Sequence, residues 1–270
     1  MAIFEYNNFY KQVLSSINMV LMLNKDNEYF RPVATYLGWT PFYKEYVGIK
    51  SNKIHQLIDD SRVPLSIFEI MKRRIDTKEE AIAIKSSWFD NYFDSSDFVI
   101  YPDDPQNNKI KILLSVDNKS NITSEGKKAF DGVYSLKNLD FGHMYIGDLS
   151  DELKGIEISK KELGKLDCML RYDEIMNSKL WRIISRNPDE VPAELAYDQD
   201  IFQEYVDLTC FRFTGGGEYK DRYMGCFLSK TDSSRMISLR LSAFSLFSNL
   251  YGEEFCENVG GRFVGFKTKN

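Results

Sequence analysis

The chain has 270 residues, 43% of them hydrophobic, which suits one large domain or two modest ones and excludes extensive disorder. Its net charge of −5 argues weakly against nucleic acid and anionic membranes as partners. It does not exclude DNA, because local patches matter more than the sum. The only histidines, His55 and His143, nearly exclude a multi-histidine metal site and most histidine-based nucleophilic catalysis.

Cysteine usage and hydropathy predict a cytoplasmic protein with no membrane partner. The four cysteines are scattered without a CxxC pair, which is typical of reduced core residues rather than of a disulfide or zinc framework. The first strongly apolar run, residues 13–23, is too short and too polar to cross a bilayer. No signal-peptide pattern precedes it.

Residues 1–77 are predicted to form a helical region, beginning with an amphipathic helix over 5–23. Within it, residues 38–75 resemble a degenerate helix-turn-helix of the Cro/repressor type, on Gly48 in the turn and apolar residues such as Ile54 and Leu57. The resemblance implies a second helix, about 51–58, lying in the major groove of DNA. Its DNA-binding side chains would be Lys50, Asn52, Lys53 and Gln56.

Local charge favours this interpretation of the N-terminal region. Residues 44–75 carry seven basic and four acidic side chains, a local charge of +3 in a chain of −5. Lys44, however, stands where the motif has a small alanine, and Asp59 and Asp60 would repel phosphate. The alternative is a plain helical bundle with a solvated basic face.

Residues 78–150 predict a small α/β unit. The order is a helix over 78–93, a strand over 98–101, a dense turn signal at 102–108, a strand over 110–116, a helix over 124–138 and a strand over 141–146. Strand alternation places Asp117 and Lys119 on one side, away from the apolar face of Ile110 and Ile112. If the two strands pair as a hairpin, Asp97 comes close to Asp117.

Two carboxylates and a lysine at that place suit phosphodiester hydrolysis. Asp97 and Asp117 could hold Mg²⁺ through hard oxygen ligands, and the metal would activate a bound water. Lys119 could orient that water or stabilise charge developing on the phosphate. A hairpin whose charged ends are merely solvated is the alternative.

The run 96–101, the strand that ends near Val116, and the triplet Asp117–Asn118–Lys119 resemble the PD-(D/E)xK motif of restriction-type endonucleases. The resemblance covers 78–147 and implies catalytic Asp97, Asp117 and Lys119. Ser96 replaces the usual proline, and the literal pair Pro102–Asp103 could serve instead of Asp97. Glu79 or Glu80 could supply a further helical carboxylate.

Residues 151–270 are predicted to be mainly helical, packed on the same core or forming a separate region, with helices over roughly 159–186 and 190–211. A hairpin or helix is expected around 222–248, where Ile237, Leu241 and Phe244 stand at helical intervals, and a last strand near 262–267. The predicted fold class is therefore α/β (α+β), helix-rich, with a small mixed sheet flanked by helices.

The sequence thus predicts a Mg²⁺-dependent endonuclease-like protein acting on DNA, for which cutting both strands would favour a homodimer. One alternative is a non-catalytic DNA-binding regulator. The other is a protein-binding or structural protein, such as a phage inhibitor or virion component, for which an acidic surface rich in Tyr and Phe is suitable.

Overall fold

A computed structural model describes residues 42–48, 50–80, 82–89, 91–101, 109–135, 152–163, 168–197, 201–214, 224–228, 235–244, 247–252 and 261–267. The predicted helix at 5–23, the turn with Asp103 and the predicted strand at 141–146 lie outside these residues. Among the described residues, no helix is long and apolar enough to cross a membrane.

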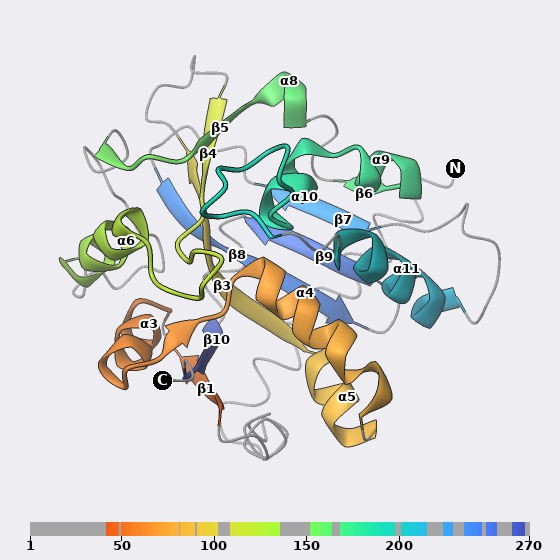
Figure 1. Cartoon of the computed structure of the whole chain (residues 1–270), viewed down its shortest axis with the longest axis horizontal. Helices are drawn as coiled ribbons and strands as arrows, with labels where there is room; N and C mark the ends of the chain where they lie inside the picture. The colour runs from red at the N-terminus through yellow and green to blue at the C-terminus, as the bar shows by residue number, and fades with distance from the viewer. Residues whose placement is uncertain are drawn as a thin grey trace, which may run out of the picture.

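The described chain alternates short helices with strands (Figure 1). Its first half contains β1 (Tyr43–Gly48), α3 (Lys50–Asp59), β2 (Val63–Pro64), α4 (Ile67–Asp76), the 3₁₀ helix η1 (Thr77–Glu79), α5 (Ile82–Phe89), β3 (Tyr92–Tyr101), β4 (Lys109–Leu113) and α6 (Ser124–Ser135). Its second half contains β5 (Ile156–Ser159), α8 (Lys160–Leu163), β6 (Cys168–Leu170), α9 (Tyr172–Met176), α10 (Lys179–Ile184), α11 (Ile201–Thr214), β7 (Met224–Leu228), β8 (Arg235–Phe244), β9 (Phe247–Gly252) and β10 (Gly261–Phe266).

One mixed sheet of ten strands organises the described residues, with the path β1-β10-β3-β8-β9-β7-β6. β2 also pairs with β10, and β4 joins β3 to β5. The β10–β3 and β7–β9 pairs are parallel, and the others are antiparallel. The predicted small sheet flanked by helices is therefore wrong. The predicted boundaries at 77 and 150 stay predictions, although this sheet takes strands from all three predicted regions.

The sheet divides along β3, which has two different neighbours on one edge. β10 lies beside its first half, where Phe263 is opposite Asp94, and β4 lies beside its second half, where Leu113 is opposite Phe98. Between these halves the register with β8 shifts. We call residues Ser95–Asp97, where one neighbour gives way to the other, the fork.

The C-terminal strands explain the wrong fold class. Residues 235–244 form β8, although Ile237, Leu241 and Phe244 suggested a helix. Ile237, Leu239 and Leu241 instead alternate with Ser238, Arg240 and Ser242, the period of a strand. All six of these side chains are buried, so the polar residues of β8 lie on a covered face of the sheet.

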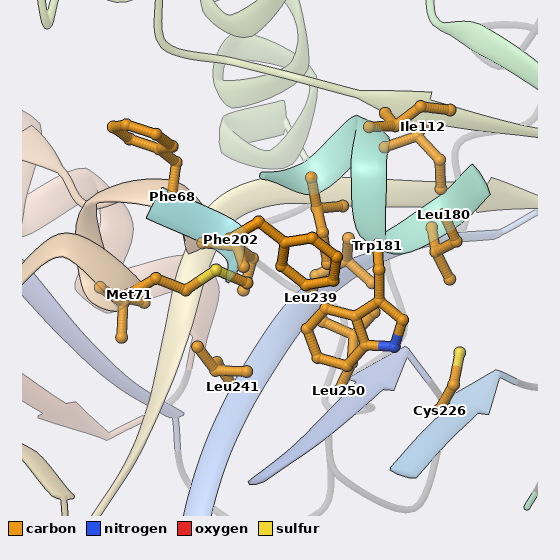
Figure 2. Packing of buried hydrophobic residues seen from close by; sticks show 14 of the residues in the cluster. Phe68, Met71, Ile112, Leu180, Trp181, Phe202, Cys226, Leu239, Leu241 and Leu250 are labelled. Atoms are coloured by element: carbon orange, nitrogen blue, oxygen red, sulfur yellow. The ribbon is translucent and has the colours of Figure 1, made fainter. Parts of the chain in front are cut away.

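Helices cover both faces of the sheet. α4, α10 and α11 pack on one face, where Phe68, Trp181 and Phe202 meet Leu239 and neighbouring strand residues (Figures 1 and 2). α3 and α6 pack on the other, where the second cluster gathers residues Tyr46, Ile54, Leu57, Phe98, Ile100, Leu113, Ala129, Phe130, Leu153, Met236 and Phe263. Burial on both faces is why β3 is buried over nearly its whole length.

Arg74 joins α4 to the sheet from inside the core. Its guanidinium is fully buried and donates to the carbonyl oxygens of Trp88, Asn91 and Leu241 and to the hydroxyl of Tyr205. A buried cation is costly unless its hydrogen bonds are met. Here the acceptors belong to α5, α11, β8 and the segment before β3. One side chain therefore fixes the position of these four parts relative to one another.

The approach of α6 to the segment after β4 gives a test of this packing. A Cβ atom at Gly126 would lie 2.4 Å from the backbone oxygen of Ser115. Although Gly to Ala in a helix is usually stabilising by about 0.5–1 kcal/mol, we expect Gly126→Ala to lower the free energy of unfolding by about 1–3 kcal/mol, because two backbones must separate. Urea unfolding followed by circular dichroism measures this change.

The exposed neighbour Lys127, changed to Ala, is the matched control and should alter stability by less than about 0.5 kcal/mol. A Gly126→Ala protein more stable than the parent would contradict the described contact.

Candidate functional site

Asp97 is the last residue of the fork and lies in the middle of β3 rather than at the start of a strand. Its side chain is 0% exposed, and Oδ1 lies 2.9 Å from Nη2 of Arg186, which is 1% exposed. Oδ2 accepts the backbone N–H of Ile67 at 2.8 Å, and the backbone of Ser115 donates a further hydrogen bond. Ile67 is the first residue of α4, so the carboxylate also lies at the favourable end of a helix dipole.

The sheet geometry explains this position. Where β10 leaves β3 and β4 has not yet joined it, backbone N–H groups need other acceptors. The N–H of Ser96 donates to the carbonyl of Leu65 at 2.9 Å, and the carboxylate of Asp97 accepts the N–H of Ile67. Burial raises the pKa of Asp97, while Arg186 and the two backbone donors oppose that rise. Asp97 therefore joins the start of α4, the segment after β4 and Arg186 to this point of β3.

Arg186 stands in a backbone conformation that normally selects glycine. Its φ is +64°, and it follows the C-cap Ser185 of α10. The N–H of Arg186 bonds to Ile183 O at 2.9 Å and that of Asn187 to Arg182 O at 3.0 Å, the pattern of a Schellman motif. A non-glycine residue in this conformation costs about 1–2 kcal/mol. The ion pair with Asp97 needs the arginine side chain at this position, which a glycine would not provide.

Glu69 borders the same pair from α4. Its Oε2 accepts the N–H and the hydroxyl of Ser66 at 2.8 and 3.0 Å, completing a capping box, and its Oε1 accepts the Ser120 hydroxyl at 3.2 Å. Burial raises the pKa of Glu69, against its hydrogen bonds with Ser66 and the charge of Arg186. Ser120 also has a positive φ, of 62°, so two strained residues adjoin this cluster.

Asp117 organises the turn that follows β4. Its Oδ1 accepts the backbone N–H groups of Lys119 and Asn121, each at 2.8 Å, and the Asn121 amide bonds to Oδ2 at 3.2 Å. This is the Asx-turn use of an aspartate. Lys119 is exposed at the tip of the turn. Asp117 is therefore held by its own loop.

The same turn is fastened to the loop before α11. The amide of Asn118 donates to the carbonyls of Ala193 and Ala196 at 3.1 and 3.0 Å, and the hydroxyl of Tyr197 to the carbonyl of Asp117 at 3.3 Å. The ring of Tyr197 also stacks on Phe68, with ring centroids 3.8 Å apart. Burial and the neighbouring carboxylate of Glu69 raise the pKa of Tyr197, so its hydroxyl stays neutral and donates.

The predicted catalytic residues thus share a neighbourhood, but each carboxylate already has a structural partner. Asp97 is sealed against Arg186, and Asp117 binds the backbone of its own turn. Among the described residues, no group of three or more His, Cys, Asp and Glu side chains is placed to hold a metal ion. The roles of Asp97, Asp117 and Lys119 in catalysis and the binding of Mg²⁺ stay predictions.

The predicted DNA-binding residues lie on or beside the exposed face of α3. Asn52 and Gln56 are exposed, and Lys53 donates to the Gln56 side chain at 2.9 Å, while the side chain of Lys50 lies outside the described residues. Residues 43–48, expected within the helix-turn-helix, form β1 and pair with β10. Tyr46 of β1 lies in the same core cluster as Ile54 and Leu57 of α3, so a strand packs on this helix where the motif has a first helix. DNA binding and a homodimer stay predictions.

A second buried pair lies three residues before the first along β3, at Asp94. Nε of Arg240 lies 3.0 Å from its Oδ1, and the N–H of Arg262 donates to its Oδ2 at 2.7 Å. The ring of Tyr92 lies 4.4 Å from the guanidinium carbon of Arg240 and 5.2 Å from that of Arg262. These contacts join β3, β8 and β10 around one carboxylate.

Sequence reasoning missed Arg186, Glu69, Tyr197 and Arg240. Arg186 is 89 residues from Asp97 and follows an ordinary short helix, so no spacing identifies it. Only Glu69 had a legible signal, because Ser66 and Glu69 spell the capping box that begins α4.

No family model matches the chain, and no curated protein matches it. Among solved structures, the chain is similar to one described as "Accommodation of massive sequence variation in Nanoarchaeota by the C-type lectin fold", with a TM-score of 0.50 and 12% sequence identity. The match covers 83% of this chain and 97% of that one. It shows the fold, which is C-type lectin-like.

This match corrects the resemblances drawn from the sequence. The similarity to restriction-type endonucleases and to a Cro/repressor helix-turn-helix is wrong, because the matched fold is that of a C-type lectin. The physical reason lies in two short segments. The aspartate in a strand occurs here because Asp97 binds the start of α4 and Arg186, and the Asp-x-Lys after the next strand occurs because Asp117 closes a turn.

Replacement of Arg186 by glycine separates its two roles. Glycine relieves the backbone cost, but it leaves Asp97 buried without its cation, which costs about 3–5 kcal/mol. We expect Arg186→Gly to lower the free energy of unfolding by about 2–4 kcal/mol in urea denaturation.

Ser61, exposed and also at positive φ (55°), is the matched control. Ser61→Gly relieves the same strain without breaking an ion pair and should leave stability unchanged or raise it by less than about 1 kcal/mol. Equal effects of the two substitutions would refute the importance of the Arg186–Asp97 pair.

The raised pKa of Glu69 predicts a pH dependence of stability. The folded chain holds a proton on Glu69 at pH values where the unfolded chain has lost it, so this residue lowers stability as pH rises from its ordinary pKa of 4.5 through the raised value. Glu69→Gln keeps a capping-box side chain and removes the titration. We expect the stability of Glu69→Gln relative to the parent to increase with pH, in urea denaturation between pH 4.5 and 8. A relative stability that decreases with pH has the wrong sign for this account.

Proposed function

We propose that the chain is a non-catalytic protein that recognises another protein through the surface of a C-type lectin-like scaffold. The burial of Asp97 against Arg186 carries this proposal. The residue that would have been the first metal ligand of a nuclease is 0% exposed and neutralised by a cation from 89 positions away. An ion pair enclosed in this way serves architecture, since a solvated phosphate could reach it only after the fork opens.

The similar solved structure also supports a role in recognition. Its description says that the C-type lectin fold accommodates massive sequence variation in Nanoarchaeota. A scaffold that keeps its shape while its sequence varies suits recognition, because contact residues can change without loss of the core. In the present chain the two buried arginine–aspartate pairs on β3 fix the sheet independently of surface residues.

Composition favours a protein as the partner rather than DNA. The chain carries a net charge of −5, and 14% of its residues are aromatic. Tyr and Phe supply large contact areas at protein interfaces, whereas a DNA-binding surface needs cations that outnumber acids. The last residue of α3, Asp59, is exposed and places an acid at the end of the helix that carries Lys53.

Assays on nucleic acid test the non-catalytic part of the proposal. Purified protein is incubated with single- and double-stranded DNA and RNA in Mg²⁺ or Mn²⁺, beside Asp117→Ala and Lys119→Ala. We expect no cleavage above the buffer blank for any of the three proteins, because both carboxylates have structural partners. Cleavage by the parent that both variants lose would refute the proposal.

The partner itself is tested by reconstitution. Cross-linking in nuclease-treated native extract identifies a candidate, and the two purified proteins are then mixed and analysed by size-exclusion chromatography with light scattering. We expect a stoichiometric complex that persists in Lys53→Ala. Binding to duplex DNA that weakens steeply with salt and with Lys53→Ala would instead support a DNA-binding regulator.

A further inference from the structure

Two buried arginines of this chain differ in how their hydrogen bonds are met. Arg74 directs each of its guanidinium nitrogens to an acceptor of the protein. Arg186 directs Nη2 to Oδ1 of Asp97 at 2.9 Å. Within the part of the chain that the structure describes, neither Nε nor Nη1 of Arg186 meets an acceptor, although the residue is 1% exposed. The ion pair therefore satisfies only part of this cation.

The remaining N–H groups of Arg186 need a partner of another kind. An arginine carries five N–H donors and no acceptor, and it keeps its charge in proteins. It therefore cannot avoid the cost of burial by losing a proton. Buried polar groups that have no partner in the protein are commonly hydrogen-bonded to an enclosed water molecule, which makes about three hydrogen bonds.

Polar groups that a water molecule could join surround the guanidinium. Burial raises the pKa values of Asp97, Glu69 and Tyr197, and the positive charge of Arg186 opposes each rise, so all three groups lie near it. A carboxylate has about four acceptor sites. Acceptors for the hydrogens of a water molecule are therefore present beside the donors that would bind its oxygen.

The balance of charge favours water over a small anion. The carboxylate of Asp97 already neutralises Arg186, and Glu69 adds a second acidic group from α4. An anion at Nε or Nη1 would bring further negative charge into a buried place whose one arginine is already paired. Burying a charge without its own partner is far more costly than burying a neutral molecule that is hydrogen-bonded.

We propose that Nε and Nη1 of Arg186 bind at least one enclosed water molecule, which links the guanidinium to the carboxyl groups beside it. The site lies between the fork, the start of α4 and the end of α10. Ser66, Asp97 and Ile184, one residue from each of these parts, are buried. The water can therefore exchange with solvent only when these parts separate locally, and it stays bound for longer than the protein takes to tumble.

Nuclear magnetic resonance on the full ¹⁵N-labelled chain tests this site, with the Hε resonances of the arginines assigned through their side-chain carbons. We expect a cross-peak between water and Hε of Arg186 that has opposite signs in the NOE and ROE spectra. This pair of signs marks contact with a long-lived water and excludes proton exchange. Arg74 is the control in the same molecule, and its Hε should show no such contact, because Nε donates to the carbonyl of Trp88.

A crystal structure of the chain grown in sodium bromide separates water from an anion. We expect electron density without anomalous signal within hydrogen-bonding distance of Nε or Nη1 of Arg186. A bromide peak at that place would overturn the proposal in favour of an anion site. Protein acceptors on both nitrogens, a cross-peak at Arg186 that arises only from proton exchange, or equal water contacts at Arg74 and Arg186 would each overturn it as well.

Discussion

The pairing of Asp97 with Arg186 is the contact on which the rest of this structure depends. β3 changes neighbours at the fork, and a sheet that divides leaves backbone groups without partners at the point of division. The N–H of Ser96 finds the carbonyl of Leu65 there, and Asp97 directs one oxygen at the start of α4 and the other at Arg186. The arginine is buried, and its backbone is strained. The ion pair offsets both the cost of burying the two charges and the cost of the strained turn. It also joins α4 and α10 to the sheet.

The cluster around this pair shows how a constellation of catalytic-looking residues can be architectural. Asp97, Glu69, Tyr197 and Asp117 are adjacent, and burial raises the pKa of three of them. Perturbed pKa values occur in active sites, but they also arise in any ion-pair network enclosed by protein. The deciding feature is what each polar atom contacts. Here the contacts are helix N-termini, turn backbones and one arginine, all of which hold chain segments in place.

Sequence reasoning predicted local features well and long-range ones poorly. The strand expected at 110–116 is present in part as β4, which ends at Leu113, with Ile110 and Ile112 in the core as alternation predicted, and the helix expected from residue 124 is α6. Leu113, which points away from Ile110 and Ile112, is also buried, in the cluster that α3 and α6 cover. Ile237 and Leu241 stand at a helical interval, but the polar residues between them on β8 are buried as well, because both faces of the strand are covered. The partnership of Asp97 with Arg186 left no local pattern at all, since neither residue's neighbours in sequence indicate where it will pack.

The order of the strands has a consequence for how this chain is made. β1 pairs with β10, and β3 pairs with β8 and β10, so the earliest described strands find their partners among the last. On a ribosome, the N-terminal half would emerge with β3 unpaired along both edges except where β4 meets it. Non-local pairing of this kind slows folding and leaves apolar edges open to other nascent chains. β10 is the last of the described strands, and the sheet cannot close until this strand has left the exit tunnel.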